Sequence, residues 1–471
     1  MTATSRYTLD PSCRVLDDGR ALLGGSPLTL FRLGSSGAGV VEAIRAGKVP
    51  PPGHEPLTDR LVDAGAAHPS PQRGTGPRAG EVTVVIPVFG TPLWRLSDLV
   101  LSCGPCSVII VDDASPRPLG SVLGADVHRL DRNVGPGGAR AAGLALVATP
   151  YVAFLDSDAT PEVGWLDALL PHLADDRVAL VAPRVRSANG DGRALARYEQ
   201  WRSPLDLGGT PARVRAGTRV SYVPAAALVA RVEALRGIGG FDTTLRYGED
   251  VDLVWRLDEA GWRVRYEPEA VVLHDPRPDA RAWLAQRVGY GSSAAPLARR
   301  HPGALAPARM NGWSAVAWGV GIVSPPAGVT VAAVTTGLLV RTLSGLAHPL
   351  RVAFRLAGLG HLFAGRILAS ALVRAWFPFA LAAALVSKRA RRAVALAVVV
   401  PPLVAWARDR PRLGLVRALG LHVADDLAYC AGLWAGMVRE RSFTAIRPVL
   451  TSDRAGPGAV EAVSGRGRAS R

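Results

Sequence analysis

The sequence predicts an α/β protein with a central parallel sheet, a small domain before it and a hydrophobic helical region after it. Between residues 81 and 274, runs of β-branched apolar residues alternate with segments of helix length. Continuously hydrophobic strands separated by helices are typical of a parallel sheet that is covered on both faces. The 471 residues suffice for about two to four domains. With 48% hydrophobic and 20% charged residues, the composition excludes a largely disordered chain.

Residues 1–75 are expected to form a small first domain. Strand-like runs at 14–16 and 21–23 flank a turn, and a helical pattern of apolar residues follows them. Residues 69–80 are rich in Pro, Gly and Arg without hydrophobic periodicity, which is typical of a linker. The sequence therefore places a domain boundary there and predicts a second domain over residues 76–300.

The second domain should contain the central sheet. Apolar runs predict strands at 82–88, 107–111 and 152–155, and the segments between them predict helices near 93–101 and 138–148. Ligands of open α/β sheets bind just beyond the carboxyl ends of the strands. The polar residues that directly follow each apolar run are therefore the candidate site residues.

Cys103 and Cys106 have the Cys-x-x-Cys spacing of redox proteins. A reactive thiol of this kind needs a helix N-terminus to lower its pKa, whereas this motif follows a helix and leads into a strand. No second pair completes a four-cysteine zinc site. Four cysteines in a chain of this length do not predict a disulfide framework either. We expect an unreactive loop.

A glycine-rich segment, residues 135–143, joins a strand to the helix expected near 138–148. It resembles the Gly-x-Gly-x-x-Gly turn of dinucleotide-binding proteins, but Pro136 and an additional glycine break the spacing. No lone acid ends a strand at the distance that NAD binding requires. We interpret the segment as a tight turn that lets a helix pack closely beside a ligand.

A hydrophobic helical region, associated with a membrane, is expected over residues 301–450. Residues 313–340 contain no charged residue, and about 20 apolar residues can cross a bilayer. Pro325 and Pro326 interrupt this run, which favours two half-helices that enter and leave from the cytoplasmic side. Residues 341–417 carry thirteen Lys or Arg and a single acid, between apolar runs. This pattern favours an anionic membrane surface, with a soluble helical domain as the alternative.

The chain is expected at the inner face of the cytoplasmic membrane. Met1 to Pro11 lacks the apolar core and cleavage site of a secretory signal, so the second domain should face the cytoplasm. The later apolar runs, at 367–386, 393–407 and 418–438, are too short or too polar to predict spans. Residues 451–471 lack periodicity and are expected to be disordered.

Two acidic pairs stand at the ends of predicted strands. Asp112 and Asp113 are adjacent, and neighbouring carboxylates repel unless something binds them, although one acid could cap the next helix. Asp156 and Asp158 occupy alternate positions of an extended segment and should point the same way. Carboxylates so placed can hold Mg²⁺ or Mn²⁺. The alternative is that Asp158 caps a helix that begins after it.

Two later positions complete the candidate site. Glu249 and Asp250 follow Gly248 at the start of a helical pattern. They could be an acidic first turn favoured by the helix dipole, or they could aim one carboxylate at a substrate hydroxyl as a general base. His274 ends an apolar run, and its imidazole is a suitable ligand for Mn-like metals. In isolation it would be a structural histidine.

Together these motifs resemble the inverting glycosyltransferases of family two, which have the GT-A fold of nucleotide-diphospho-sugar transferases. The resemblance covers about residues 81 to 290. It rests on the segments 84–88, 112–115, 133–135, 156–158, 239–242 and 248–250.

The resemblance implies a role for each candidate residue and a divalent cation, Mg²⁺ or Mn²⁺, as cofactor. The implied donor-binding residues are Pro87, Val88, Phe89, Asp112, Asp113, Asn133, Gly135 and Asp156. The implied metal ligands are Asp156, Asp158 and His274. The implied catalytic residues are Asp250, as the base, and its neighbour Glu249. A metal would stabilise the charge on the departing nucleoside diphosphate.

Residues 9–68 resemble the small winged-helix domains that hold peptide substrates in radical-peptide maturation systems. Joined to the transferase and the arginine-rich tail, they make the whole chain similar to the mycofactocin-system glycosyltransferases of actinobacteria. That resemblance implies a nucleotide-sugar donor, UDP-glucose, and a peptide-derived acceptor that receives a short β-linked oligosaccharide. Because no Gln-x-x-Arg-Trp motif is present, processive synthesis through a membrane channel is not expected.

Three other functions are compatible with parts of the sequence. A rhamnosyl- or galactofuranosyltransferase of the cell envelope would share every catalytic residue. A non-catalytic scaffold would not need the acids at 156, 158 and 250. Nucleic-acid binding could explain the net charge of +16, but all basic residues except Lys48 and Lys388 are arginines, which is also the coding bias of a GC-rich genome. We therefore expect no nucleic-acid partner.

Overall fold

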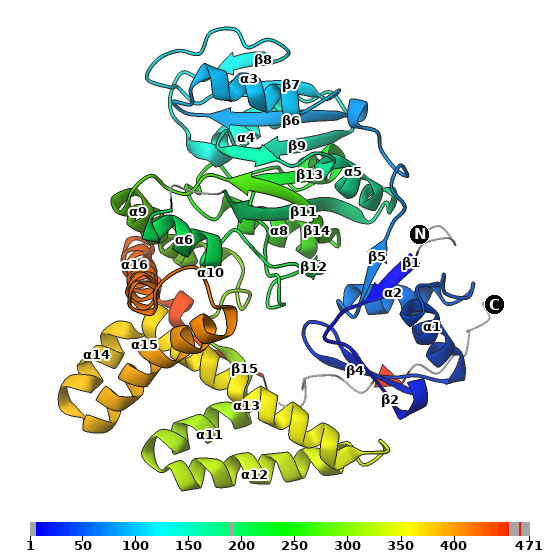
Figure 1. The fold of residues 1–471 in the computed structure, drawn as a ribbon, viewed down its shortest axis with the longest axis vertical. Coiled ribbons are helices and arrows are strands. Elements are labelled where there is room, and N and C mark those ends of the chain that lie inside the picture. Colours follow the sequence, from blue (N-terminus) through cyan, green and yellow to red (C-terminus); the bar gives the residue numbers. More distant parts are fainter. Residues whose placement is uncertain (1–5, 189–191, 452–460, 463–471) are drawn as a thin grey trace.

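A mixed sheet of nine strands forms the centre of the computed structural model, which describes residues 6–188, 192–451 and 461–462 (Figure 1). In the order in which they neighbour one another, the strands on its main path are β10 (Ala159–Pro161), β14 (Arg263–His274), β11 (Val178–Ser187), β13 (Ala227–Arg231), β9 (Tyr151–Leu155), β6 (Val82–Val88), β7 (Ser107–Asp112) and β8 (Asp126–Arg129). The short strand β12 (Ala212–Val214) pairs with β14. The strands predicted at 82–88, 107–111 and 152–155 are confirmed.

The prediction of a parallel sheet was wrong for part of it. Strands β9, β6, β7 and β8 are parallel, but β13 is antiparallel to both β9 and β11. Strand β13 starts at the end of the sheet where β11 finishes, so it runs in the direction opposite to both of its neighbours. Hydrophobic composition does not reveal this reversal, because a strand buried on both faces is equally apolar in either direction.

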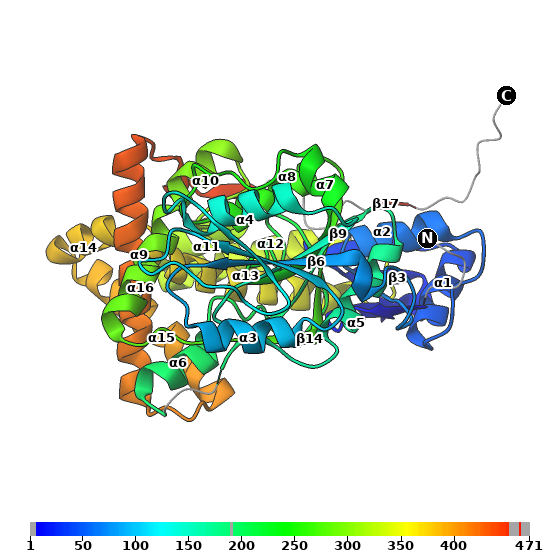
Figure 2. The ribbon, with the colours of Figure 1, turned by 90° about the horizontal axis from the view of Figure 1, so that it is seen from above.

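Helices cover both faces of the sheet, as Figure 2 shows from above. One apolar core lies under α4 (Gly135–Leu146), α7 (Val232–Gly237) and α8 (Glu249–Glu259). The other lies under α3 (Leu93–Ser102) and α5 (Trp165–Leu169). Further short helices are η2 (Ala79–Glu81), η3 (Leu170–Ala174) and α6 (Ala194–Arg202). Residues 159–161 form strand β10, which excludes the alternative in which Asp158 caps a helix.

The first domain folds around its own apolar core, which includes Leu22, Phe31 and Val40. Its sheet contains β2 (Arg14–Leu16), β3 (Ala21–Gly24), β4 (Thr29–Arg32) and the two-residue strand β17 (Glu461–Ala462). The remaining elements are β1 (Arg6–Leu9), which pairs with β5 (Ala67–Ser70), the turn η1 (Asp17–Gly19), α1 (Ser35–Arg45) and α2 (Glu55–Asp63).

Arginine–aspartate pairs attach the first domain to the central sheet. Asp59 accepts two hydrogen bonds of 2.8 Å from Arg177, and Asp63 accepts bonds of 2.7 and 2.8 Å from Arg263 at the start of β14. Bidentate pairs of this kind fix orientation as well as adding energy. The first domain therefore has a defined position beside the sheet.

The C-terminal region is helical. Its helices are α9 (Ala280–Ser292), α10 (Ala294–Arg300), α11 (Gly312–Val323), α12 (Pro325–Thr342), α13 (Pro349–Arg374), α14 (Phe377–Val386), α15 (Lys388–Asp409), α16 (Leu415–Glu440) and η4 (Thr444–Ile446). Strand β15 (Arg309–Asn311) pairs with β16 (Val449–Thr451). Of the tail predicted to be disordered, residues 452–460 and 463–471 lie outside the described residues.

The uncharged run at 313–340 is divided, as predicted from its prolines. Helix α11 ends at Val323, α12 begins at Pro325, and the two pack closely enough that a Cβ on Gly328 would lie 2.5 Å from the Cα of Gly321. Within the described residues, the helices long and apolar enough to cross a membrane are instead α13 and α15. The sequence does not predict α13 as a span, because its residues are split between a basic segment and an apolar run.

Many large apolar side chains of these helices are exposed, including Phe354, Leu359 and Leu362 on α13 and Val400 and Val404 on α15. An exposed apolar surface of this extent marks an interaction site in a protein that is otherwise well packed. The other side of the region packs on α6 of the central domain and on the sheet of the first domain.

Candidate active site

A large cavity of about 1650 Å³ opens beyond the carboxyl ends of β6, β7 and β9. It is lined by the central domain and by C-terminal helices. The predicted site residues that line it are Pro87, Val88, Phe89, Asp113, Asn133, Gly135, Asp156, Asp158, Glu249, Asp250 and His274. Residues from segments up to about 190 positions apart in the sequence therefore meet in one cleft, as expected of the switch region of an α/β sheet.

Asp156, Asp158 and His274 form a group that could hold a metal ion. Ligand atoms of the three side chains all lie within 4.8 Å of one another. The antiparallel pairing of β10 with the end of β14 brings them together, because Ala159 lies opposite His274. His274 Nε2 lies 3.1 Å from Asp158 Oδ1, and its Nδ1 lies 3.0 Å from the carbonyl oxygen of Asp275. Two carboxylates and an imidazole suit Mn²⁺ and Mg²⁺, so the residues fit the implied cofactor.

Charge couples Asp158 to His274. Burial raises the pKa of Asp158, but its hydrogen bond to His274 and the nearby Arg277 outweigh burial and lower that pKa to about 2. Burial lowers the pKa of His274, whereas Asp158 raises it more, so the net shift is upward. Asp158 is therefore an anion at neutral pH, which is the form that binds a cation.

Arg140 joins this group to the second acidic pair. It is buried on α4 and donates hydrogen bonds from Nη2 to Asp156 (2.6 Å) and from Nη1 to Glu249 (2.8 Å). Burial opposes its charge, but the two carboxylates raise the pKa of Arg140 above its usual value. The guanidinium therefore remains charged and spaces two acids that would otherwise repel.

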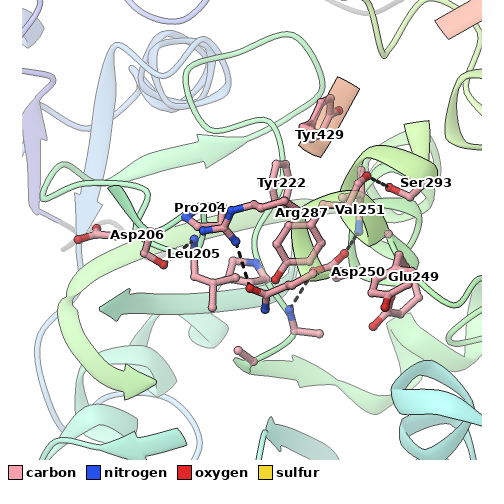
Figure 3. Close-up of a pocket in the computed structure, with 18 of the residues that line it drawn as sticks. Pro204, Leu205, Asp206, Tyr222, Glu249, Asp250, Val251, Arg287, Ser293 and Tyr429 are labelled. Atoms are coloured by element: carbon pink, nitrogen blue, oxygen red, sulfur yellow. Dashed lines mark hydrogen bonds between the residues drawn. The ribbon is translucent and has the colours of Figure 1, made fainter. Parts of the chain in front are cut away.

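Glu249 and Asp250 lie in the first turn of α8. Gly248 precedes them with a φ of 79°, a left-handed conformation that glycine adopts without strain. Asp250 accepts hydrogen bonds from the backbone N–H of Val251 (2.8 Å) and Ala225 (3.4 Å). These bonds fix the carboxylate at the cavity wall (Figure 3).

The pKa values of the two neighbouring carboxyl groups, Glu249 and Asp250, are both raised. Burial and the charge of Asp250 raise the pKa of Glu249 to about 7, although Arg140 opposes this. Burial also raises the pKa of Asp250, against the opposing effects of the Val251 N–H and of Arg140. Since the groups interact, protons leave the pair in steps that belong to both residues. A carboxylate whose pKa approaches neutrality is suited to proton transfer.

The other end of the cavity contains the predicted donor-binding residues. Asp113 accepts hydrogen bonds from the backbone N–H groups of Val134 (2.7 Å) and Gly135 (2.9 Å), while Asn133 donates to the Asp113 carbonyl oxygen (3.2 Å). These bonds fold the loop before α4 against the end of β7. Asp113 thus shapes the cavity wall.

Asp112 is not brought into the cavity. Its side chain is fully buried, and it accepts hydrogen bonds from the Ser115 N–H (2.9 Å), the Leu119 N–H and the Arg129 guanidinium. The repulsion expected between adjacent acids is therefore relieved by donors of the protein itself. We leave Asp112 out of the proposed donor site, because its carboxylate faces the loop after β7.

The glycines of α4 allow close packing, as predicted. A Cβ on Gly143 would lie 2.3 Å from Val85 Cγ1 on the neighbouring strand. A Cβ on Gly137 would lie 3.0 Å from Glu249 Cγ. The glycine pattern therefore brings α4, and with it Arg140, close to the sheet and to the acidic turn.

The Cys-x-x-Cys loop lies apart from the cavity. Cys103 follows the C-terminal end of α3, and its thiol donates to the Leu99 carbonyl oxygen (3.2 Å). Burial raises the pKa of Cys103 to about 12 and that of Cys106 to about 11. These thiols stay protonated and weakly nucleophilic, in agreement with the prediction of an unreactive loop.

The sequence did not reveal several residues that line the cavity. Arg140 is one of many arginines and stands in no recognisable motif. Tyr222, Tyr290 and Tyr429 surround the cavity near Asp250, from a loop, α9 and α16. The glycine-rich segment around Arg140 predicts only that a helix packs closely beside a ligand, and it does not single out this arginine.

Comparisons with known proteins show the family to which the chain belongs. The family model described as "Glycosyl transferase family 2" matches residues 83–237. Two strains of Mycobacterium tuberculosis have a pre-mycofactocin glycosyltransferase that is 44% identical over 460 residues, which is 94% of this chain and 97% of that protein. The N-acetylglucosaminyl-diphospho-decaprenol L-rhamnosyltransferase of the same species is 32% identical over 138 residues, covering 25% of this chain and 45% of that enzyme.

Among solved structures, a mannosyltransferase from Pyrobaculum calidifontis in complex with GDP-Man and Mn²⁺ shows a partial likeness. Its TM-score is 0.42 at 18% identity, over 78% of this chain and 89% of that chain. The full-length match to the M. tuberculosis enzyme and the family model decide the classification. The chain belongs to glycosyl transferase family 2, in one family with the pre-mycofactocin glycosyltransferase of M. tuberculosis, and is a glycosyltransferase with a GT-A-like α/β fold.

Proposed function

We propose that this enzyme is a metal-dependent, inverting hexosyltransferase of pre-mycofactocin synthesis. It moves glucose from UDP-glucose onto a peptide-derived acceptor and builds a short β-linked oligosaccharide. The observation that carries the proposal is the meeting of two groups in one cavity: a metal-ligand group, Asp156, Asp158 and His274, and a buried acidic pair, Glu249 and Asp250. The full-length similarity to an enzyme named for pre-mycofactocin supports the acceptor class.

The proposed roles follow from the arrangement of the side chains. Pro87 to Phe89 and the loop held by Asp113 receive the nucleoside at one end of the cavity. Asp250, fixed by two backbone N–H groups, accepts the proton of the attacking hydroxyl. Because the hydroxyl attacks the anomeric carbon opposite the departing diphosphate, an α-linked donor yields a β-linked product.

Asp156, Asp158 and His274 would hold Mg²⁺ or Mn²⁺. When bound, such an ion stabilises the charge that develops on the departing nucleoside diphosphate. Arg140 has a supporting role, since it neutralises Asp156 and Glu249 and keeps the two acidic groups at fixed separation.

The pH dependence of turnover should reveal the protonation of Glu249 and Asp250. A base must be ionised, and the pKa values of both Asp250 and Glu249 are raised, so kcat/KM is expected to rise with pH as this interacting pair loses its protons. Glu249→Gln removes the carboxylate that repels the charge of Asp250, and this lowers the pKa of Asp250. The rising limb of the profile should then move to lower pH by about one pH unit.

The measurement is kcat/KM for UDP-glucose transfer between pH 5 and 9, with Glu269→Gln as the matched control. Glu269 is exposed on β14 and does not line the cavity, so its profile should equal that of the unchanged enzyme. A rising limb that stays in place or moves to higher pH in Glu249→Gln would contradict the proposed coupling.

We also propose that the first domain is a winged-helix-like module that binds the peptide-derived acceptor. Deleting residues 1–75 should abolish transfer to that acceptor, measured as hexose mass gain by mass spectrometry. The slow release of UDP from donor in the absence of acceptor should persist, because the cavity takes no residue from the first domain. That release is the control for folding, which is needed because Leu23 and Leu30 pack against Leu343 and Leu346.

The same deletion distinguishes the proposed function from the alternative of a cell-envelope glycosyltransferase. A rhamnosyl- or galactofuranosyltransferase acting on a lipid-linked glycan would keep its activity without residues 1–75. Retained transfer to the peptide-derived acceptor would argue against the proposed module.

For the C-terminal region we propose attachment to the cytoplasmic face of the membrane. The exposed apolar side chains of α11 to α15 and the arginines between them support this location. By length and composition, helices α13 and α15 could also cross a membrane.

A further inference from the structure

The cavity continues past Asp250 toward the C-terminal helices. We call this part the distal arm. Its lining residues used below are Tyr198, Trp201, Asp409, His422, Asp425 and Tyr429. They come from α6, α15 and α16, so the C-terminal region supplies much of the wall.

The cavity is larger than a nucleotide-sugar donor alone requires. Sites for a single small ligand usually measure about 300–1,000 Å³, whereas this cavity measures about 1650 Å³. Room therefore remains for an acceptor of several rings beside the donor.

The distal arm combines aromatic faces with carboxylates. Trp201 Nε1 donates to Asp409 Oδ2 (3.0 Å), and the Tyr198 hydroxyl donates to Asp425 Oδ2 (3.1 Å). The rings of Tyr198 and Trp201 meet edge to face, with centroids 6.2 Å apart. Tyr198 is fully buried and supports Trp201, whereas Trp201 is only partly buried and Asp409 is exposed. Asp409 keeps further acceptor capacity for ligand hydroxyls, and the face of the Trp201 ring that Arg202 does not cover suits the C–H groups of a sugar ring.

Tyrosines connect the base to the distal arm. Tyr222 lies between Arg287 and Asp250 in Figure 3, with Tyr429 beyond it. Burial, followed by Asp250 and Tyr429, raises the pKa of Tyr222 to about 12, so its hydroxyl remains protonated. In the described part of the chain, the hydroxyls of Tyr222, Tyr290 and Tyr429 have no hydrogen-bond partner, and all three residues line the cavity. These hydroxyls are available to a ligand.

We propose that the distal arm is a saccharide-binding subsite for the growing β-linked chain, and that the C-terminal helices thereby set the length of the product. This inference rests on the proposed function. In the first transfer the acceptor needs only the region beside Asp250 and Tyr222. Once sugars have been added, the saccharide reaches Trp201 and Asp409. These two residues are hydrogen-bonded to each other and not to Asp250.

The same bonds form and break in each extension step. The oxygen of the terminal hydroxyl of the bound chain forms a bond to the anomeric carbon of the donor glucose. The bond from that carbon to the phosphate oxygen breaks, and UDP leaves with the bonding electrons. The hydroxyl proton passes to Asp250.

The test uses the full-length protein, UDP-glucose, Mn²⁺ and three soluble probes, namely p-nitrophenyl β-glucoside and its β-linked di- and triglucoside homologues. In the unchanged enzyme, kcat/KM should increase with probe length. Trp201→Ala should lower kcat/KM for the triglucoside by about tenfold, the effect of one aromatic contact, and leave the monoglucoside within twofold. Trp201→Phe, which keeps a ring, should restore most of the difference.

Trp94→Ala is the matched control, since Trp94 is exposed on α3 and lies outside the cavity. Calorimetry with the triglucoside alone supplies a second measurement, in which Trp201→Ala should weaken binding by about tenfold. Equal losses for all probes, or no loss for any, would overturn the saccharide subsite while leaving the proposed function intact. No transfer by the unchanged enzyme to any probe or to the peptide-derived acceptor would overturn both.

Discussion

Asp250→Asn is expected to lower kcat by about 10²- to 10⁴-fold, the usual contribution of a general base. The asparagine oxygen can still accept the hydrogen bond from the Val251 N–H, so α8 should keep its first turn. UDP binding should stay within about twofold, because the role proposed for Asp250 is toward the acceptor and not toward the nucleotide. The measurement is steady-state turnover combined with calorimetric titration of UDP.

Asp176→Asn is the matched control for this substitution. The Asp176 side chain is fully exposed and does not line the cavity, so turnover should not change. Full activity in Asp250→Asn would remove this residue from the mechanism. A parallel loss of UDP binding would instead assign it to the donor site.

Asp158→Ala is expected to abolish tight Mn²⁺ binding and to lower kcat/KM by about 10³-fold, because the charge on the departing diphosphate loses several kcal/mol of stabilisation. Treating the unchanged enzyme with a chelator should have an equal effect, and added Mn²⁺ should reverse it. In Asp158→Ala, added Mn²⁺ should not restore activity. Manganese binding can be followed by electron paramagnetic resonance.

Glu269→Ala is the matched control for the metal site. This acid is on β14, as is His274, but its side chain is exposed and 3.9 Å from its nearest cationic partner, Arg73. It should bind Mn²⁺ and turn over as the unchanged enzyme does. Activity that survives complete removal of divalent cations would argue against metal dependence.

The sequence predicted the core of the catalytic domain well. Strand ends are marked by an abrupt change from apolar to acidic residues, and this change alone is enough to place Asp113, Asp156 and Asp158 at one edge of the sheet. The family resemblance, the enzymatic activity and the GT-A-like fold are confirmed. The domain boundaries, the winged-helix resemblance and the individual residue roles stay predictions.

The remainder of the site could not be predicted, because it depends on contacts between distant segments. Arg140 acquires its role only when α4 lies over Glu249, more than one hundred residues later in the sequence. Tyr222 and Tyr429 are individually ordinary tyrosines. The direction of β13 depends on which strands it pairs with, and no local pattern of residues encodes that pairing. Asp112, although adjacent to Asp113, points away because alternate residues of a strand face opposite sides.

The position of α13 has a practical consequence for obtaining a water-soluble enzyme. Arg374, at the end of this helix, donates to Asp426 on α16 at the wall of the cleft, while Phe354, Leu359 and Leu362 face outward. Cutting the gene after residue 300 would remove the exposed apolar surface together with residues that line the cavity. Polar replacement of the outward side chains is the better engineering route, because it leaves the inner face of the same helix untouched.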